Sequence, residues 1–322
     1  MEKIKKILIT GGNGYIGSRL SIYLANKGYE VTPLCFPEIP QDESWIKMMY
    51  SVLCGDIRDN NFIKKVSKNN YDAIIHLISL DHCQSSGDPF FVSSINITPT
   101  WCLLENFSKT GLKNFIYFST MQVYGELPET NISENYPPNT VNAYALTHLM
   151  CEQFCEHYNR NSQVKCNVLR LSNSYGAPVF IDNNCWHLVI NDLCKTAYAK
   201  KEIILQSDGS PQRDFIHGWD VARAVETILN SENEQMIYNV SSGKTMTILE
   251  IALKIKQVYQ LRYNENINIF TSDGIVNPPL DIKSSKYTID NSRLSKLGYE
   301  TEWDLDKGIN DLFQFLEKNQ QS

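Results

Sequence analysis

Two side chains able to exchange protons stand four residues apart in the segment Asn142–His148. They are the phenol of Tyr144 and the imidazole of His148, and the pattern around them predicts a helix over Tyr144–Tyr158. Residues spaced i and i+4 lie on one face of a helix, so both groups face the same site. A phenol acts as a general base only when its pKa falls well below about 10. The spacing therefore places the imidazole of His148 beside the phenol of Tyr144.

A glycine-rich segment near the start, Thr10-Gly11-Gly12-Asn13-Gly14-Tyr15-Ile16-Gly17, follows an apolar run and opens another predicted helix. One glycine permits a tight turn, a second lets the backbone approach a pyrophosphate, and a third lets helix and strand pack closely. The helix N-terminus offers free N–H groups and a positive dipole end to phosphates. The segment predicts dinucleotide binding, and a glycine-rich turn without a ligand is the alternative. The expected contacts are Gly11, Gly14, Tyr15, Ile16 and Gly17.

The end of the second predicted strand bears on the type of dinucleotide. Cys35 occupies the position where an Asp or Glu usually holds the adenosine ribose 2′-hydroxyl. We see no Arg or Lys beside Cys35 in the sequence to receive a 2′-phosphate, so NAD is expected rather than NADP. Asp56 and Ile57, after the third strand, are candidates for the adenine edge. A turn or helix cap is the alternative role for Asp56.

Short apolar runs alternate with helical patterns through the first half of the chain. This alternation predicts an α/β fold, with a doubly wound parallel sheet of the Rossmann type. The predicted strands are Lys6–Thr10, Tyr29–Leu34, Ser51–Cys54, Ala73–Leu77, Phe115–Ser119, Cys166–Leu171 and Met236–Val240. The predicted helices are Tyr15–Asn26, Asn60–Ser67, Pro99–Lys109 and Tyr144–Tyr158.

Beyond Leu171 the pattern becomes irregular, and Pro178 and the Pro278–Pro279 pair mark loops. We therefore expect two interleaved domains. Residues 1–172 form an NAD-binding Rossmann domain, to which 212–240 return. Residues 173–211 and 241–322 form a smaller substrate lobe.

Composition limits the classes of partner. The net charge is −6 without a basic stripe, which disfavours nucleic acid. The apolar runs are shorter than the roughly 18–20 residues that a membrane helix needs, so no membrane is expected. Nine cysteines are scattered without a Cys-x-x-Cys pair. Reduced thiols in the cytoplasm are the expected state.

His148, Cys151 and Cys155 also fall on one face of the predicted helix, where they could hold a soft metal. Zinc needs a fourth ligand, and the same face must carry Tyr144. Thiols that pack the helix against the core are the favoured interpretation, and no metal is expected.

Several separated motifs resemble the extended short-chain dehydrogenases, a family that includes NAD-dependent nucleotide-sugar epimerases and dehydratases. The similarity runs from Lys6 to about Gly243. Besides the glycine loop, the motifs are Tyr71–Leu77, Phe118–Gly125, Asn142–His148, Leu169–Gly176 and Arg213–His217.

The resemblance implies roles for individual residues. Tyr144 is the proton acceptor, and the Thr120 hydroxyl hydrogen-bonds the reacting oxygen. His148 replaces the Lys that lowers the tyrosine pKa and holds the nicotinamide ribose. Further cofactor contacts are implied at Leu77, Ile78, Ser79 and Asn96. Substrate contacts are implied at Thr120, Gln122, Asn173 and Arg213.

His148 is the largest departure from the family pattern. A neutral imidazole can donate one hydrogen bond to the ribose, and a protonated one would partly replace the missing charge. The favoured interpretation of this replacement is a modified but working active site. A non-catalytic NAD-binding sensor of the same fold is the alternative.

The family's 4,6-dehydratases carry an acidic pair after the active-site Thr, where this chain has Met121 and Gln122. Neither side chain transfers a proton, so dehydration is disfavoured. The resemblance leaves NAD-dependent chemistry at the fourth carbon of a nucleotide-diphosphate sugar, as a 4-epimerase or as a 4-dehydrogenase releasing a keto sugar. It also implies a homodimer through the helices near Pro99–Lys109 and Tyr144–Tyr158. The nucleotide base and the sugar are left open, since the late segment Asn277–Asp281 lacks the family's Arg, and Lys283 or Lys286 could substitute for it.

Overall fold

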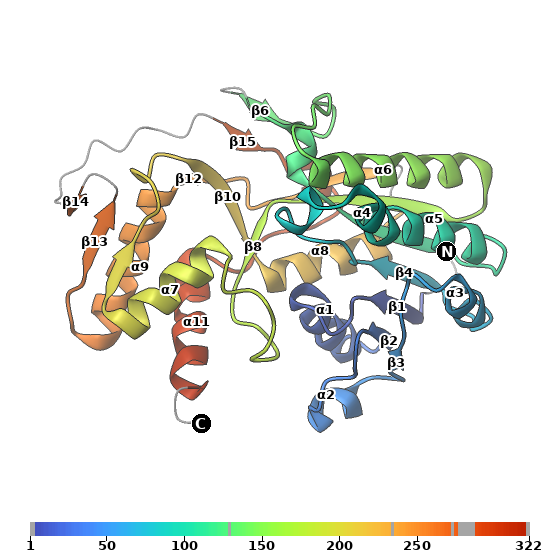
Figure 1. The fold of residues 1–322 in the computed structure, drawn as a ribbon, viewed down its shortest axis with the longest axis horizontal. Helices are drawn as coiled ribbons and strands as arrows, with labels where there is room; N and C mark the ends of the chain where they lie inside the picture. Colours follow the sequence, from blue (N-terminus) through green and yellow to red (C-terminus); the bar gives the residue numbers. More distant parts are fainter. Residues whose placement is uncertain (1–3, 128–129, 233–234, 272–273, 276–286, 320–322) are drawn as a thin grey trace.

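A seven-stranded sheet forms the centre of the molecule, in the order β11-β7-β5-β4-β1-β2-β3 (Figure 1). The structure is a computed structural model that describes residues 4–127, 130–232, 235–271, 274–275 and 287–319. All of the neighbouring strands in this sheet run parallel, which confirms the predicted fold class. The strands are β1 (Lys6–Thr10), β2 (Glu30–Cys35), β3 (Leu53–Cys54), β4 (Ala73–His76), β5 (Asn114–Thr120), β7 (Lys165–Leu171) and β11 (Ile237–Val240).

The central strands are buried on both faces. Every residue of β5 is buried, as expected for a parallel strand covered by helices on each side. Side chains along β1 alternate between two apolar clusters: Ile7 and Ile9 face one, and Leu8 faces the other. This arrangement explains why the strands were readable as continuous apolar runs in the sequence.

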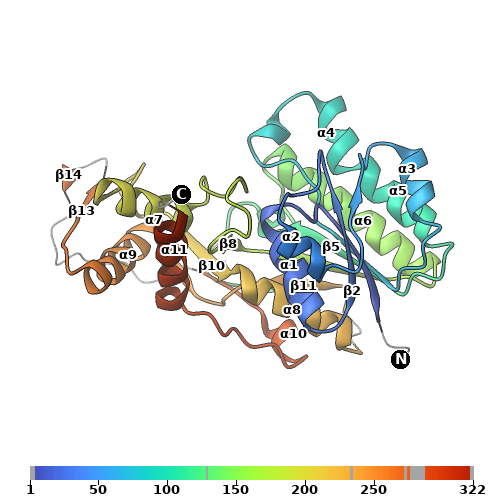
Figure 2. The same cartoon turned by 90° about the horizontal axis from the view of Figure 1, so that it is seen from below.

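Helices cover both faces of this sheet (Figure 2). The Ile7 face is packed by α1 (Tyr15–Asn26), α2 (Glu43–Met48), α8 (Gly218–Asn230) and α10 (Ser292–Ser295). The Leu8 face is packed by α3 (Asn60–Val66), α5 (Thr98–Phe107) and α6 (Ala143–Asn161). The helix α4 (Pro89–Asn96) packs on α5 and α6. Short 3-10 helices are formed by η1 (Gln84–Ser86) and η2 (Met121–Tyr124).

A smaller lobe with its own apolar core lies at the left in Figure 1. Its helices are α7 (Val189–Lys200), α9 (Ile248–Tyr263) and α11 (Leu305–Asn319). Its strands are β8 (Asn173–Tyr175), β9 (Glu202–Ile204), β10 (Gln212–His217), β12 (Thr245–Thr247), β13 (Asn268–Thr271) and β14 (Gly274–Ile275). A separate pair consists of β6 (Asn131–Ile132) and β15 (Thr288–Ile289).

The returning segment 212–240 divides between the two parts of the molecule. Its first strand, β10, pairs with β8 and β12 in a three-stranded sheet. Its helix α8 and strand β11 pack with the large sheet. The loop Pro278–Pro279, the segment Asn277–Asp281, Lys283 and Lys286 lie outside the described residues.

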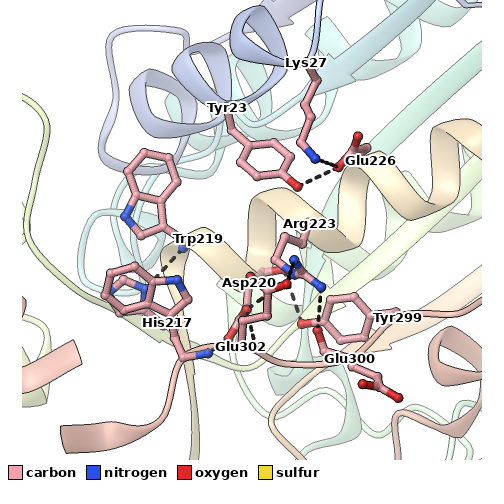
Figure 3. Close-up of polar contacts among 11 residues, drawn as sticks. Tyr23, Lys27, His217, Trp219, Asp220, Arg223, Glu226, Tyr299, Glu300 and Glu302 are labelled. Atoms are coloured by element: carbon pink, nitrogen blue, oxygen red, sulfur yellow. Dashed lines mark hydrogen bonds and ion pairs between the residues drawn. The ribbon is translucent and has the colours of Figure 1, made fainter. Parts of the chain in front are cut away.

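One carboxylate ties the C-terminal segment to the large domain before that segment enters α11. Asp220, in the first turn of α8, accepts hydrogen bonds from the backbone N–H groups of Glu302 (2.9 Å) and Trp303 (3.0 Å) (Figure 3). On the other side of α8, Glu226 accepts from the hydroxyl of Tyr23 on α1 at 2.6 Å. The helix α8 is thereby fixed to both α1 and the chain that leads to the smaller lobe.

Across the ranges that the structure describes, no helix is long and apolar enough to cross a membrane. In those same ranges, no group of three His, Cys, Asp or Glu side chains is arranged to hold a metal ion.

Candidate active site

The glycine loop joins β1 to α1 at the carboxyl end of the sheet. Gly11 has φ = 73°, a conformation that disfavours a Cβ. A Cβ on Gly17 would lie 2.1 Å from the Gly11 carbonyl oxygen, so this glycine lets the helix approach the loop closely. Gly14 is exposed, and a Cβ there would meet only the Gly11 oxygen, at 3.1 Å, leaving its outer side open.

The start of α1 fits a dinucleotide pyrophosphate. Gly14 caps the helix without any side-chain hydrogen bond, and the first turn carries no acidic residue. The backbone N–H groups of this turn therefore retain their capacity for an anion, and the helix dipole favours one. An open glycine surface beside unoccupied N–H donors is what a diphosphate needs.

Tyr15 and Ile16 use their side chains for support. The Tyr15 hydroxyl donates to the carbonyl oxygen of Gly176 at 2.9 Å, and Arg19 stacks on its ring. Ile16 packs against the core of the large sheet. Their side chains therefore tie the loop to its surroundings, and a contact to the cofactor would come from their backbone.

The loops after β2 and β3 meet because these strands pair in register, with Cys35 opposite Cys54. Cys35 is fully buried, and burial raises the pKa of its thiol to about 12. Asp56 pairs with Arg58 at 2.5 Å, and Ile57 is buried. The Arg58 guanidinium carbon lies 5.9 Å from the ring centre of Phe36, the residue that follows Cys35. The sequence shows no Arg or Lys beside Cys35, and it is the register of β2 and β3 that brings Arg58 close to the following residue, Phe36.

Tyr144 lies in the first turn of α6, at the carboxyl end of the sheet. The side chain of Asn142 caps this helix by accepting from the N–H of Ala145 at 2.8 Å. Thr120 ends β5, and Ser79 follows the adjacent strand β4. The hydroxyls of Thr120 and Ser79 lie close enough to the side chain of Tyr144 to lower its pKa through hydrogen bonding. The structure thus brings together three hydroxyls that the sequence had placed on three separate motifs.

The phenol of Tyr144 is held in its protonated form in the cofactor-free protein. Burial raises its pKa above the ordinary value of about 10, and the negative charge of Asp81 adds to this increase. Hydrogen bonds with Thr120 and Ser79 act in the opposite direction without cancelling the effect of burial.

His148 does not supply a positive charge. It is 3% exposed, and burial lowers its pKa to about 4. Its Nδ1 lies 2.8 Å from the carbonyl oxygen of Tyr144, which only accepts hydrogen bonds, so Nδ1 carries the proton of the neutral ring. With a neutral ring that donates to this carbonyl, no N–H of His148 is left for the ribose, and the two options that the sequence offered, a protonated ring or a donor to the ribose, are not favoured by this geometry. The single donor is used within α6, and Nε2 is an acceptor.

Asn96 supports the site through hydrogen bonds to the loop after β4 and to α6. Its Oδ1 accepts from the N–H of Leu80 at 2.8 Å, and its Nδ2 donates to Thr147 at 3.0 Å and to Ser85 at 3.2 Å. The side chain is buried and joins the loop after β4 to the helix α6. We therefore assign Asn96 a positioning role. Leu77 and Ile78, on the same loop, pack against the two cores of the sheet.

The expected substrate contacts are spread over a wider region. Asn173 lies beside the active strand end, with its Nδ2 at 3.8 Å from the sulfur of Met121 and 2.8 Å from the carbonyl oxygen of Asp214. Gln122 is exposed and accepts from Asn142 at 3.3 Å. Arg213 is exposed on β10, where its guanidinium donates to the carbonyl oxygen of Gln212. Asn173 thus contacts the residue after Thr120, and the N–H of Gln122 donates to the Thr120 hydroxyl at 3.2 Å.

The loop after β4 brings two groups to Tyr144 that sequence reasoning missed. The rings of His82 and Tyr144 have centres 6.4 Å apart, and His82 is exposed. Asp81 lies close enough to affect the Tyr144 pKa, and it accepts from the N–H of Gln84 at 2.8 Å. Both residues stand outside any motif, and only the fold of the loop over α6 reveals them.

Known proteins resemble the chain over most of its length. The profile described as the "NAD dependent epimerase/dehydratase family" matches residues 7–241. A UDP-glucose 4-epimerase of Bacillus subtilis is 30% identical over 282 residues, which cover 78% of this chain and 81% of that protein. A dTDP-D-glucose 4,6-dehydratase of Mus musculus is 24% identical, covering 98% and 89%. The structure of a Thermus thermophilus UDP-glucose 4-epimerase with NAD superposes with a TM-score of 0.80 at 22% identity, covering 97% and 98%.

The family match spans both the glycine loop and the segment that carries Thr120, Tyr144 and His148, and it confirms the resemblance inferred from the motifs. The expectation that NAD is a cofactor is confirmed as well, because this family is NAD dependent. The chain therefore belongs to the NAD-dependent epimerase/dehydratase family and is an enzyme whose cofactor is NAD.

Proposed function

We propose that this enzyme is a 4-epimerase acting on a nucleotide-diphosphate sugar. The observation that carries the proposal is the meeting of Tyr144, Thr120 and Ser79 at the carboxyl ends of β4 and β5. The glycine loop follows β1, which pairs directly with β4. Ligands of open parallel sheets bind at this edge, so the hydroxyls lie next to the cofactor loop.

The chemistry follows from these groups. Thr120 and Ser79 hold the reacting hydroxyl and the phenol in one hydrogen-bonded set. As phenolate, Tyr144 takes the proton of the sugar 4-hydroxyl while the C4–H bond breaks and a ketone forms. NAD, when bound beside these residues, would supply the acceptor for the hydride and the source for its return. When the hydride returns to the opposite face, Tyr144 gives the proton back, and the inverted alcohol results.

His148 would hold the cofactor with the reverse hydrogen-bond polarity of a lysine. Because its Nε2 is an acceptor, a ribose hydroxyl must donate to it. Cofactor contacts are proposed at Gly11, Gly14 and Gly17, and at Asp56 with Ile57.

Water elimination is disfavoured in this arrangement. Met121 is buried, and Gln122 faces the cap residue Asn142, so neither position provides an acid or a base.

A second outcome, net oxidation to a 4-keto sugar, is favoured by one observation. The exposed imidazole of His82 beside Tyr144 offers the phenolic proton a route to solvent.

Incubation with a panel of nucleotide sugars tests the proposal, with uridine diphosphate sugars first. We expect NMR to show a product of unchanged mass with inverted configuration at the fourth carbon. Accumulation of reduced nicotinamide with a keto sugar would establish the second outcome. A product lighter by one water would overturn both.

We also propose a homodimer formed through α5 and α6. These helices expose large apolar side chains, Trp101 at 53%, Leu146 at 48% and Met150 at 41%. Trp101 stacks on Phe154 at 5.2 Å and 20°, which joins the two helices into one surface. Exposed apolar patches of this kind mark interfaces. A dimer mass in light scattering is expected, as is a monomer for Met150→Asp. A monomeric wild-type protein at micromolar concentration would contradict the proposal.

We propose the division that the sequence suggested apart from β10, with residues 1–172 and the α8–β11 part of 212–240 in the NAD-binding domain, and with 173–211, β10 and 241–322 in the substrate lobe. The cytoplasm is the proposed compartment, since all nine cysteines are free thiols.

A further inference from the structure

The adenosine end of the cofactor site lacks the group that rejects a 2′-phosphate. NAD-selective Rossmann folds place an acid at the end of the second strand, where it binds the ribose hydroxyls and repels a phosphate. Cys35 stands at that position, fully buried, and its raised pKa keeps it an uncharged thiol at physiological pH. Nothing at this residue opposes a negative charge on the ribose.

A positive charge stands next to this position. Arg58 lies in the loop after β3, and its guanidinium carbon is 5.9 Å from the ring centre of Phe36, immediately after Cys35. Phe36 is 49% exposed, so its ring and the neighbouring guanidinium can be reached from solvent. A guanidinium presents paired N–H donors that match a phosphate.

Asp56 is the competing partner of Arg58. Its carboxylate oxygens lie 2.8 and 2.9 Å from the Arg58 Nε. The side chains of Arg58 and Asp56 are 41% and 31% exposed, and ion pairs of such exposure are weak and readily exchanged. A phosphate dianion can therefore share or replace the carboxylate, while Asp56 limits how far it is preferred.

We propose that the cofactor site accepts NADP as well as NAD, with Arg58 binding the 2′-phosphate. The inference rests on the proposed function, which places the adenosine over the loops after β2 and β3.

Calorimetry on the purified full-length protein, titrated with NAD and separately with NADP, tests this directly. We expect the two dissociation constants to agree within about tenfold. Arg58→Gln should weaken NADP binding by about tenfold or more while changing NAD binding by less than about twofold, because only the phosphate loses its partner. Asp56→Asn should strengthen NADP binding, and Cys35→Asp should weaken it selectively.

Arg160→Gln is the matched control, because Arg160 is an exposed arginine paired with Glu156 far from this site, on the last turns of α6. It should alter neither affinity. The inference is overturned when NADP binds more than about tenfold more weakly than NAD, or when Arg58→Gln leaves NADP affinity unchanged. Binding of NAD with rejection of NADP leaves the proposed function intact, whereas failure of both dinucleotides to bind overturns the proposed cofactor site as well.

Discussion

Glu152 and Arg170 form an ion pair deep inside the large domain, with Arg170 Nη2 at 2.6 Å and Nε at 3.0 Å from the two carboxylate oxygens. Their side chains are 2% and 3% exposed. Ser119, the residue before Thr120, donates to the same carboxylate at 2.6 Å. The pair therefore fixes the helix that carries Tyr144 against the strand that carries Thr120.

We expect removal of one partner of this pair to be costly. Glu152→Gln leaves the Arg170 guanidinium buried without a counter-charge, and such losses are about 3–5 kcal/mol of unfolding free energy. The double variant Glu152→Leu/Arg170→Met should lose less than either single variant, since no charge stays buried alone. Urea unfolding measures these differences.

The exposed pair Glu156–Arg160 on the same helix provides the control. Arg160→Met should change the unfolding free energy by less than about 1 kcal/mol. A Glu152→Gln protein as stable as the wild type would mean that the buried pair does not hold α6 in place.

The large sheet was predictable because the apolar character of each strand follows from that strand's own burial. A parallel strand covered on both faces must be apolar throughout, so β1 and β5 stood out as runs, and the glycine loop marked the start of α1 at Tyr15. The smaller lobe was not predictable in this way. Its strands β8 and β9 have three residues each, and their pairing is decided by distant partners.

The residues of the candidate site likewise fall into those that the sequence could predict and those that it could not. Thr120 and Tyr144 stand at motif positions tied to a strand end and a helix start, so their meeting could be anticipated. Arg58 and His82 lie on loops, where only the register of β2 with β3 and the path of the chain after β4 reveal what they face. The neutral state of His148 depends on burial and on a backbone carbonyl, neither of which has a signature in the sequence.

Tyr144→Phe should abolish turnover while leaving NAD binding nearly intact. Only the hydroxyl is lost, and a general base contributes roughly 10²–10⁴-fold to the rate. The ring and its packing against His148, at 4.3 Å between centres, are kept. Turnover on the identified substrate and calorimetric NAD affinity give the two readouts. Full activity in the variant would refute Tyr144 as the proton acceptor.

His148→Lys should shift the activity profile toward lower pH. In the wild type the pKa of Tyr144 is raised, and the neutral His148 offers no charge to lower it, so kcat should rise with increasing pH. An ammonium at this position favours the phenolate and lowers the Tyr144 pKa, which moves the rising limb to lower pH. The pH dependence of kcat and an absorbance titration of the phenol both report the change.

His157→Lys, an exposed substitution on the same helix, should leave that profile where it is. If the rising limb of the kcat–pH profile does not move in His148→Lys, residue 148 does not influence the pKa of Tyr144.

Three buried histidines should make the fold sensitive to acid. Burial lowers the pKa of His76 to about 3, of His148 to about 4 and of His217 to about 2. In the unfolded chain each titrates near about 6.5. Below that pH the unfolded state binds protons that the folded state refuses, so stability is lost as pH falls from about 6.5 toward the folded values.

Each such histidine removes about 1.4 kcal/mol of unfolding free energy per pH unit in this window. Asp214 and Glu134, whose pKa values burial raises, act in the opposite direction. The difference in unfolding free energy between a variant and the wild type therefore isolates one histidine better than the pH dependence of the wild type alone. Between pH 7 and about pH 5.5, His148→Gln should lose about 1.2–1.4 kcal/mol less than the wild type, because one proton-binding site disappears from the unfolded chain. His157→Gln, at an exposed position, should show the wild-type dependence. Parallel curves for wild type and His148→Gln in urea unfolding would mean that His148 titrates alike in the native and unfolded states, and the burial that keeps its ring neutral would be refuted.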